Sequence, residues 1–265
     1  MPHSLPTVNW VEFIADGGLR ASRPLPEIVA AVAGSGCGAI GLDDVSVGHE
    51  GIDDAVSLLR HHGLSCTDVG VLRVGASGRS ASAEWLARLA QRTGARLCVA
   101  ALYASPAHAG VMHELDRSAK VLSAVGVRLA LEFAPYSPLD SLAATVALCE
   151  RIGWERCGVL LDAWHFCKGG APWTELRALG LEQIALVHLS DAPEPESDDL
   201  RHESRFRRVP PGAGTLPLHE FVVTLRELGY TGVVSAEVLS ADLRAMPPAA
   251  GARLLADALQ ASWPS

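Results

Sequence analysis

Residues 127–133 read VRLALEF, and the architecture of the chain can be worked out from this segment. Its apolar residues are of types that are frequent in β-strands. Gly126, directly before the segment, is typical of the end of a helix. Glu132 is the second-last residue of the segment. Alternation along a strand places Arg128, Ala130 and Glu132 on one face and the large apolar side chains on the other. The segment therefore predicts a strand whose inward-facing row finishes in a carboxylate.

The same arrangement returns along the chain, because an amphipathic stretch gives way to an apolar run after each of seven glycines: Gly36, Gly63, Gly94, Gly126, Gly153, Gly180 and Gly229. Glycine adopts the left-handed conformation that ends many helices. Subtracting consecutive positions gives intervals of 27, 31, 32, 27, 27 and 49 residues. A TIM barrel of about 250 residues uses about 31 residues per unit. The sequence thus predicts a (β/α)8 TIM barrel, eight-stranded and parallel, in a single domain over residues 1–265.

We expect the eight strands near residues 8–14, 39–42, 65–69, 97–102, 127–133, 158–162, 184–189 and 233–238. Helices are expected between them, with a final helix at 248–262 that closes the ring. The longest interval contains a polar insertion at residues 191–217, DAPEPESDDLRHESRFRRVPPGAGTLP. Long loops that follow barrel strands lie over the active-site mouth, so this insertion is expected to cover a substrate.

Four apolar runs, VRLALE, GVLLD, IALVH and VVSAE, end in polar residues: Glu132, Asp162, His188 and Glu237. Parallel strands would bring these ends to one rim of the barrel. Two carboxylates about 4 Å apart repel by about 4 kcal/mol at an effective dielectric near 20, and a divalent cation removes that cost. The four residues are therefore predicted to bind one divalent metal. Oxygen ligands with one imidazole favour Mn²⁺, with Mg²⁺, Co²⁺ or Zn²⁺ as alternatives.

Composition limits the classes of partner. The chain has 265 residues, 49% of them hydrophobic, which is enough to bury one large core. Its net charge of -8 favours a small carbohydrate or keto substrate over nucleic acid. Six cysteines without a C-x-x-C pair indicate free thiols in a reducing cytosol, and no segment has the pattern of a signal peptide or membrane span. We therefore expect a cytoplasmic protein that does not bind membranes. For its oligomeric state, the sequence is compatible with a monomer and with a homo-oligomer.

Several motifs resemble one known group: LALEFAP, GVLLDAWHFCKGG, ALVHLSDA, RVPPGAG and VVSAEVLS. They are similar to the xylose isomerase-like TIM-barrel superfamily of sugar (phosphate) isomerases and epimerases, which includes inosose and 3-dehydroshikimate dehydratases and an apurinic endonuclease branch. The resemblance implies that the four rim residues bind the metal and that His165 hydrogen-bonds substrate. It also implies that an arginine of the insertion contacts substrate oxygens. Arg201 is favoured among four candidates, the others being Arg205, Arg207 and Arg208.

The expected chemistry is proton abstraction next to a metal-polarised carbonyl, with Glu132 and Glu237 as the catalytic acids on either side of the ion. Return of the proton gives an isomerase or epimerase, whereas protonation of a β-hydroxyl gives a dehydratase. A non-catalytic metal-binding barrel is a further alternative, since Ala213 and Leu216 stand where many relatives have acidic residues. A three-metal nuclease is disfavoured because the expected third and fourth strands end without histidine.

The remaining candidates each have two interpretations. Lys168 would bind a substrate carboxylate or phosphate, or else be solvated. Asp191 would accept a proton from a ring nitrogen of His188 and fix its tautomer, or else cap the backbone. Apolar walls of the pocket are expected from aromatic residues near strand ends, namely Trp10, Tyr103 and Trp164.

Overall fold

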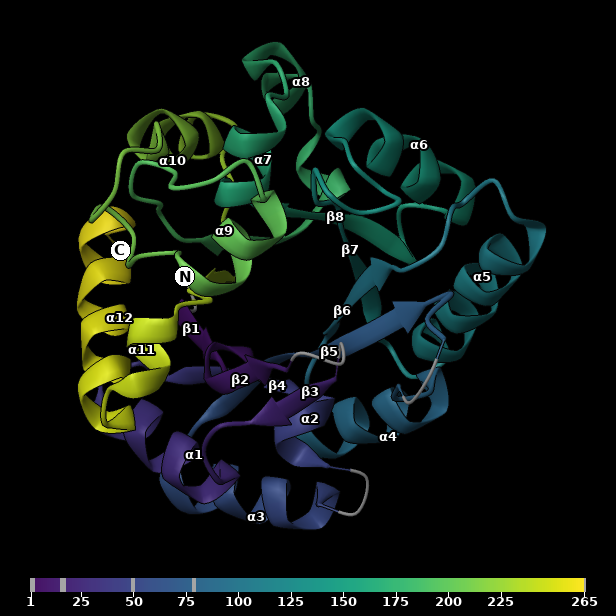
Figure 1. The fold of residues 1–265 in the computed structure, drawn as a ribbon. Coiled ribbons are helices and arrows are strands. Elements are labelled where there is room, and N and C mark those ends of the chain that lie inside the picture. Colours follow the sequence, from purple (N-terminus) through teal and green to yellow (C-terminus); the bar gives the residue numbers. More distant parts are fainter. Residues whose placement is uncertain (1–2, 15–17, 49–50, 78–79, 265) are drawn as a thin grey trace.

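The computed structural model describes residues 3–14, 18–48, 51–77 and 80–264. Eight parallel strands close into a barrel, each hydrogen-bonded to its neighbours in chain order, with the last beside the first (Figure 1). The strands are β1 (His3–Pro6), β4 (Ala39–Asp43), β5 (Ser65–Val74), β6 (Leu97–Leu102), β7 (Arg128–Glu132), β8 (Cys157–Asp162), β9 (Ile184–Leu189) and β10 (Val234–Ala236). The (β/α)8 prediction is confirmed.

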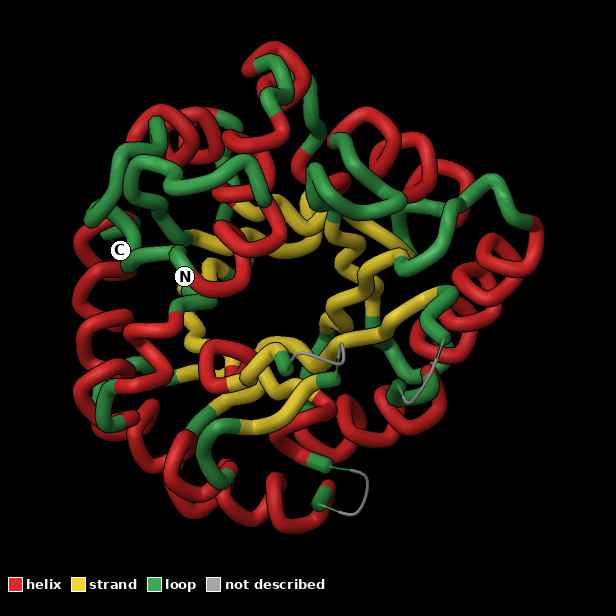
Figure 2. The backbone as a smooth tube through the Cα atoms, in the orientation of Figure 1, coloured by secondary structure: helices red, strands yellow, loops and turns green. Residues whose placement is uncertain are grey.

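Helices surround the barrel (Figure 2). The long ones are α1 (Leu25–Gly34), α3 (Ile52–His62), α4 (Ala83–Thr93), α5 (Ala109–Ser123), α6 (Leu142–Ile152), α10 (Leu218–Glu227) and α12 (Pro248–Ser262). Six of the seven glycines predicted to follow helices have positive φ, for example Gly94 at 82°. The prediction is wrong at Gly180, whose φ of -76° starts a short 3-10 helix, η2 (Leu181–Gln183), directly before β9.

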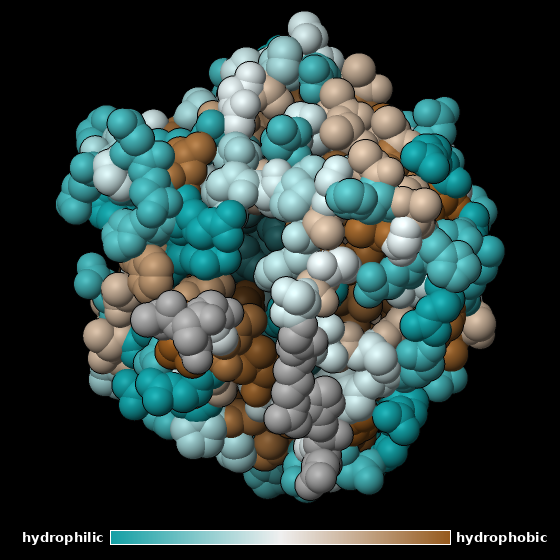
Figure 3. Space-filling model, turned by 45° about the vertical axis from the view of Figure 1, so that its right-hand side comes forward, coloured by the Kyte–Doolittle hydropathy of each residue, from teal (hydrophilic) through white to brown (hydrophobic). Residues whose placement is uncertain are grey.

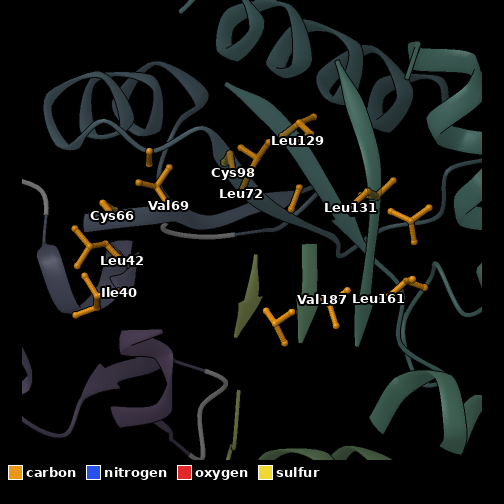
Figure 4. Packing of buried hydrophobic residues seen from close by; sticks show 14 of the residues in the cluster. Ile40, Leu42, Cys66, Val69, Leu72, Cys98, Leu129, Leu131, Leu161 and Val187 are labelled. Atoms are coloured by element: carbon orange, nitrogen blue, oxygen red, sulfur yellow. The ribbon is translucent and has the colours of Figure 1, made fainter. Parts of the chain in front are cut away.

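Side chains alternate between two layers along each strand. Val99, Ala130 and Leu160 form a small cluster on the inner face. Leu129 and Leu131 belong to the larger cluster between strands and helices (Figure 4). Each leucine buried in this way stabilises the fold by about 1.5–3 kcal/mol. The alternation predicted for residues 127–133 is thus observed, and it turns Glu132 inward.

The first strand was predicted at residues 8–14, and this position is wrong. The barrel strand is β1, which ends at Pro6, and a 3-10 helix, η1 (Thr7–Trp10), follows it. The buried Asn9 side chain donates to the carbonyl of Ala236 at 2.9 Å and accepts from the N–H of Val238 at 2.7 Å. These two bonds fix η1 against the end of β10. The next residues form β2 (Val11–Phe13), which pairs antiparallel with β3 (Leu19–Ala21) outside the barrel.

The remaining α-helices are short: α2 (Asp44–Val47), α7 (Ala163–Gly169), α8 (Trp173–Arg177), α9 (Leu200–Phe206) and α11 (Ala241–Ala245). Helix α9 lies in the polar insertion, in front of the barrel opening (Figure 1). Asp199 caps it by accepting from the backbone N–H groups of Arg201 and His202. An antiparallel bridge between Asp191 and Val209 closes the base of the insertion.

Other expectations have simple outcomes. All six cysteines are free, and five of them are buried. Strand β5 runs five residues further than predicted, to Val74, and its end also lacks histidine. None of the described helices combines the length and apolar character needed to cross a bilayer.

Candidate metal centre

Four neighbouring strands supply the polar cluster at the barrel mouth. Glu132 ends β7, Asp162 ends β8 and His188 lies one residue before the end of β9. Asp162 and His188 are register partners, and Glu237 follows β10 directly. The backbone N–H of Glu237 still donates to the carbonyl of Leu189 at 3.1 Å, so the β10 chain continues alongside β9. Parallel pairing therefore brings all four side chains to one rim.

Each of the four side chains offers a ligand atom, and these atoms lie within 4.8 Å of one another. Glu132 Oε1 and His188 Nε2 are buried and have no hydrogen-bond partner among the described residues, while His188 Nδ1 lies 3.4 Å from Glu237 Oε1. Such an unsatisfied buried group costs about 1–3 kcal/mol, which a coordinated cation would remove. Three carboxylates with one imidazole match the ligand preference of hard to borderline divalent ions. The cluster therefore fits a divalent metal site.

Crowding of charge shifts the pKa values of the cluster. Burial, together with the charges of Glu237 and Asp162, raises the pKa of Glu132 to about 8. Burial lowers the pKa of His188, but the surrounding carboxylates outweigh it and raise the value to about 9. For Glu237, burial raises the pKa, while the positive charges of His188 and Arg208 overcome it and leave the pKa below its ordinary value. Without a metal, Glu132 and His188 therefore hold protons at neutral pH, and these protons offset part of the negative charge of the cluster.

Arg208 is the arginine of the insertion that enters this cluster. Its side chain is almost fully buried, and Nη1 donates to Asp162 Oδ2 at 2.8 Å and to Glu237 Oε2 at 3.3 Å. Nε donates to the carbonyl of Ser204 at 2.9 Å. The sequence favoured Arg201, which is exposed and donates to the carbonyl of Tyr136 at 3.0 Å. One feature of the sequence could have identified Arg208: it lies directly before VPPGAG, whose Val209 pairs with Asp191 just after β9.

His165 lies in the first turn of α7. Asp162 caps this helix by accepting from the His165 backbone N–H at 2.8 Å. Nε2 of the ring lies 3.1 Å from Arg208 Nη2. Burial, with a smaller contribution from Arg208, lowers the pKa of His165 to about 4. Because a guanidinium only donates, the neutral ring accepts at Nε2 and carries its proton on Nδ1.

A pocket of about 390 Å³ opens above the cluster, and Glu132, His165, Arg208 and Glu237 all line it. Figure 3 shows a hollow on this side of the molecule, with hydrophilic residues on one side of it and hydrophobic residues on another. Tyr103, half exposed, lines the pocket as predicted for a wall residue.

Three predicted pocket residues lie elsewhere. Trp164 is fully buried, with the Arg208 guanidinium carbon 5.3 Å from its ring centroid, so it supports the arginine from behind. Trp10 is also fully buried, in the core. Lys168 lies in the last turn of α7, partly exposed, and is not among the residues that line the pocket.

Asp191 does not hold the His188 ring, so that expectation is corrected. Its Oδ1 accepts from the backbone N–H groups of Ala192 at 2.8 Å and Leu216 at 2.9 Å. The Asp191 carboxylate thus caps backbone N–H groups of the insertion, which is the second of the two interpretations given for it above. Gly214 permits this arrangement, since a Cβ there would lie 2.5 Å from Asp191 Oδ1 and 2.3 Å from the carbonyl oxygen of Ala192.

Two curated relatives are similar in sequence to part of this chain. An inosose isomerase of Halalkalibacterium halodurans is 31% identical over 130 residues, which are 48% of this chain and 44% of that protein. A 3-dehydroshikimate dehydratase of Pseudomonas putida is 30% identical over 90 residues, which are 34% of this chain and 14% of that protein. The chain therefore spans less than half the length of these relatives.

Solved structures share the fold over nearly the whole chain. A crystal structure of IOLI protein with a bound zinc atom superposes with a TM-score of 0.82 at 16% identity, covering 99% of this chain and 98% of that one. D-Psicose 3-epimerase with D-tagatose from Clostridium cellulolyticum H10 gives a TM-score of 0.69 at 17% identity, covering 99% and 98%. The family model described as xylose isomerase-like TIM barrel matches residues 29–262. The chain belongs to the xylose isomerase-like TIM barrel family.

Proposed function

We propose that this protein is a divalent-metal-dependent isomerase or epimerase that acts on a sugar, sugar phosphate, ketose or cyclitol. The observation that carries this proposal is the presence of two acids, Glu132 and Glu237, in one metal-binding cluster and on the wall of one pocket. Similarity to inosose isomerases supports a polyhydroxylated ketone as substrate. Mn²⁺ is the proposed ion because the donor set is rich in oxygen.

Bound in the cluster, the ion would polarise the substrate carbonyl and acidify the neighbouring C–H. One of the two glutamates removes that proton, and the other delivers a proton, either to the opposite face of the same carbon or to the neighbouring oxygen-bearing carbon. Proton transfer by a positioned side chain contributes about 100- to 10,000-fold to a rate. Glu132 and Glu237 come from β7 and from the end of β10, with β8 and β9 between them. This separation supports a role for each on a different side of the substrate.

Arg208 and His165 complete the proposed site. Arg208 holds Asp162 and Glu237 through its hydrogen bonds and keeps these carboxylates ionised. His165 lines the pocket as a neutral imidazole, and we assign it contact with a substrate hydroxyl. Both residues thus orient groups around the reacting carbon without giving up a proton themselves.

A second candidate is a dehydratase that uses the same residues. Similarity to the 3-dehydroshikimate dehydratases of Pseudomonas putida and Pseudomonas aeruginosa favours it. After the same proton abstraction, the second acid would protonate a β-hydroxyl, which leaves as water while a C=C bond forms.

The test is solvent isotope exchange by the manganese-loaded protein. Ketoses, an inosose and 3-dehydroshikimate are incubated in D₂O, and NMR follows deuterium at the carbon next to the carbonyl. An isomerase or epimerase incorporates deuterium and yields an isomer, whereas a dehydratase yields an absorbing conjugated product. Glu237→Gln should abolish either signal, and Arg177→Gln, a surface change in α8, should preserve it. Manganese binding without exchange or dehydration of any substrate would favour a non-catalytic barrel.

A further inference from the structure

Helix α9 places two arginines, Arg201 and Arg205, on the wall of the pocket. Residues four apart lie on the same side of a helix, so the two guanidinium groups approach the pocket from one element. Glu132 and Glu237 line the same pocket. A ligand there therefore meets the metal cluster on the strand side and two arginines on the insertion side.

The charge of these two arginines is not balanced by the described residues. Their neighbours are paired: Arg207 lies 2.7 Å from Glu203 Oε2, and Arg208 lies 2.8 Å from Asp162 Oδ2. Arg201 donates to the carbonyl of Tyr136, which is neutral. Neither Arg201 nor Arg205 forms an ion pair with a carboxylate in the parts of the chain that the structure covers. In a protein with a net charge of -8, this is a specific local excess of positive charge.

Aromatic rings hold both guanidinium groups in place. The guanidinium carbon of Arg201 lies 5.3 Å from the ring centroid of Tyr136, and that of Arg205 lies 4.7 Å from the ring centroid of Phe13. Such contacts contribute about 0.5–1 kcal/mol at exposed sites. They use the face of the guanidinium. Arg201 donates one N–H to the Tyr136 carbonyl, and its other N–H groups, with those of Arg205, are left for a ligand. The N–H edge of a guanidinium matches the oxygens of a carboxylate or phosphate.

We propose that Arg201 and Arg205 form a subsite for an anionic group, a carboxylate or a phosphate, carried by the substrate whose carbonyl lies at the metal cluster. This inference rests on the proposed function and narrows it to acidic or phosphorylated hydroxy-ketones in place of neutral sugars. A pocket of about 390 Å³ is within the range of sites for small molecules. With a cation-binding cluster at one end and cationic side chains at the other, the pocket gives such a substrate one orientation.

Calorimetry on the manganese-loaded protein tests the subsite with three probes: D-fructose, D-fructose 6-phosphate and D-fructuronate. We expect the wild-type protein to bind at least one charged probe at least about tenfold more tightly than D-fructose. Arg201→Gln combined with Arg205→Gln should reduce this preference below about threefold. Arg177→Gln, which removes an exposed arginine outside the pocket, is the matched control and should retain the full preference.

The probes also separate the two sources of negative charge, because tighter binding of the phosphate or of the carboxylate identifies the group that the subsite accepts. Wild-type protein without preference for either charged probe, or a preference that survives the double substitution, overturns the subsite. Manganese titration of the double variant shows whether its metal centre is intact. Failure of the proposed function appears separately, as absent deuterium exchange in protein that still prefers a charged probe.

Discussion

Arg208 Nη1 lies 2.8 Å from Asp162 Oδ2, and both side chains are almost fully removed from solvent. A permanent cation of the protein is therefore part of the carboxylate cluster. It balances some of the negative charge of Asp162 and Glu237, while Glu132 Oε1 and His188 Nε2 are buried without a hydrogen-bond partner among the described residues. The cluster is thus stabilised in part by the chain and in part by whatever cation it binds.

Replacing this arginine should unbalance the cluster. Arg208→Met keeps an apolar stem but leaves Asp162 and Glu237 without their cation, and breaking a buried pair costs about 3–5 kcal/mol. We expect the free energy of unfolding of the metal-free protein to fall by this amount in urea titrations. Arg177→Met, which breaks an exposed pair with Glu220, should cost about 0–1 kcal/mol. Equal losses in the two variants would contradict the role given to Arg208.

The stability of the metal-free protein should fall as pH rises from about 6.5 to 9. His188 has a pKa near 9 in the folded state against 6.5 ordinarily, so its stabilising contribution is present below pH 6.5 and lost through pH 9. Glu132 has a pKa near 8 against 4.5, so its stabilising contribution is complete below pH 4.5 and is lost as the pH rises through 8, which adds to the fall between pH 6.5 and 8. Urea unfolding in EDTA at several pH values measures this slope.

Manganese should reverse that dependence, because ligands bind metal in their deprotonated forms and binding releases protons. Unfolding midpoints in saturating Mn²⁺ should therefore hold steady or rise over the same pH interval. Parallel curves with and without the ion would mean that the shifted groups are not the ligands.

Glu237→Gln should preserve the shape of the side chain while removing an anionic ligand and a proton carrier. We expect deuterium exchange to fall by about 100- to 10,000-fold, the usual contribution of a positioned acid or base. Circular dichroism should show the barrel intact. An exchange rate equal to that of the wild-type protein would remove Glu237 from the proposed chemistry.

Gly214→Ala should disrupt the insertion. The added Cβ would lie 2.3 Å from the backbone oxygen of Ala192, which accepts from the backbone N–H of Thr215 at 2.8 Å, so moving this oxygen aside would break that bond. Overpacking of this kind costs about 1–3 kcal/mol. Gly110→Ala in α5 is the control, because a Cβ there meets nothing within 4 Å and alanine favours a helix by about 1 kcal/mol. Thermal unfolding should show a loss in the first variant and none in the second.

The barrel and the convergence of its four rim residues could be predicted because both depend on repeated local patterns. Glycine after each helix and alternation along each strand are visible in the sequence, and parallel pairing alone then brings Asp162 beside His188. The first strand escaped prediction because β1 is only four residues long and ends in proline, whereas residues 8–14 carry a stronger apolar pattern.

Long-range side-chain contacts could not be predicted. Residues 201–208 contain four arginines of similar surroundings in the sequence, and only the folded insertion shows that Arg208 is buried against Asp162 while Arg207 pairs with Glu196 and Glu203. The partner of Asp191 depended in the same way on Leu216, which is 25 residues further along the chain. Such contacts depend on the path of the loop in the folded protein, and local sequence patterns do not determine that path.

The binding of one divalent cation by Glu132, Asp162, His188 and Glu237 is tested most directly by manganese titration followed by electron paramagnetic resonance. We expect one tight site per chain in the wild-type protein. His188→Ala should weaken it by more than about 100-fold, beyond the usual effect of losing an outer-sphere partner. Wild-type affinity in the His188→Ala protein, or no stoichiometric site in the wild-type protein, would contradict a shared metal centre at the barrel rim.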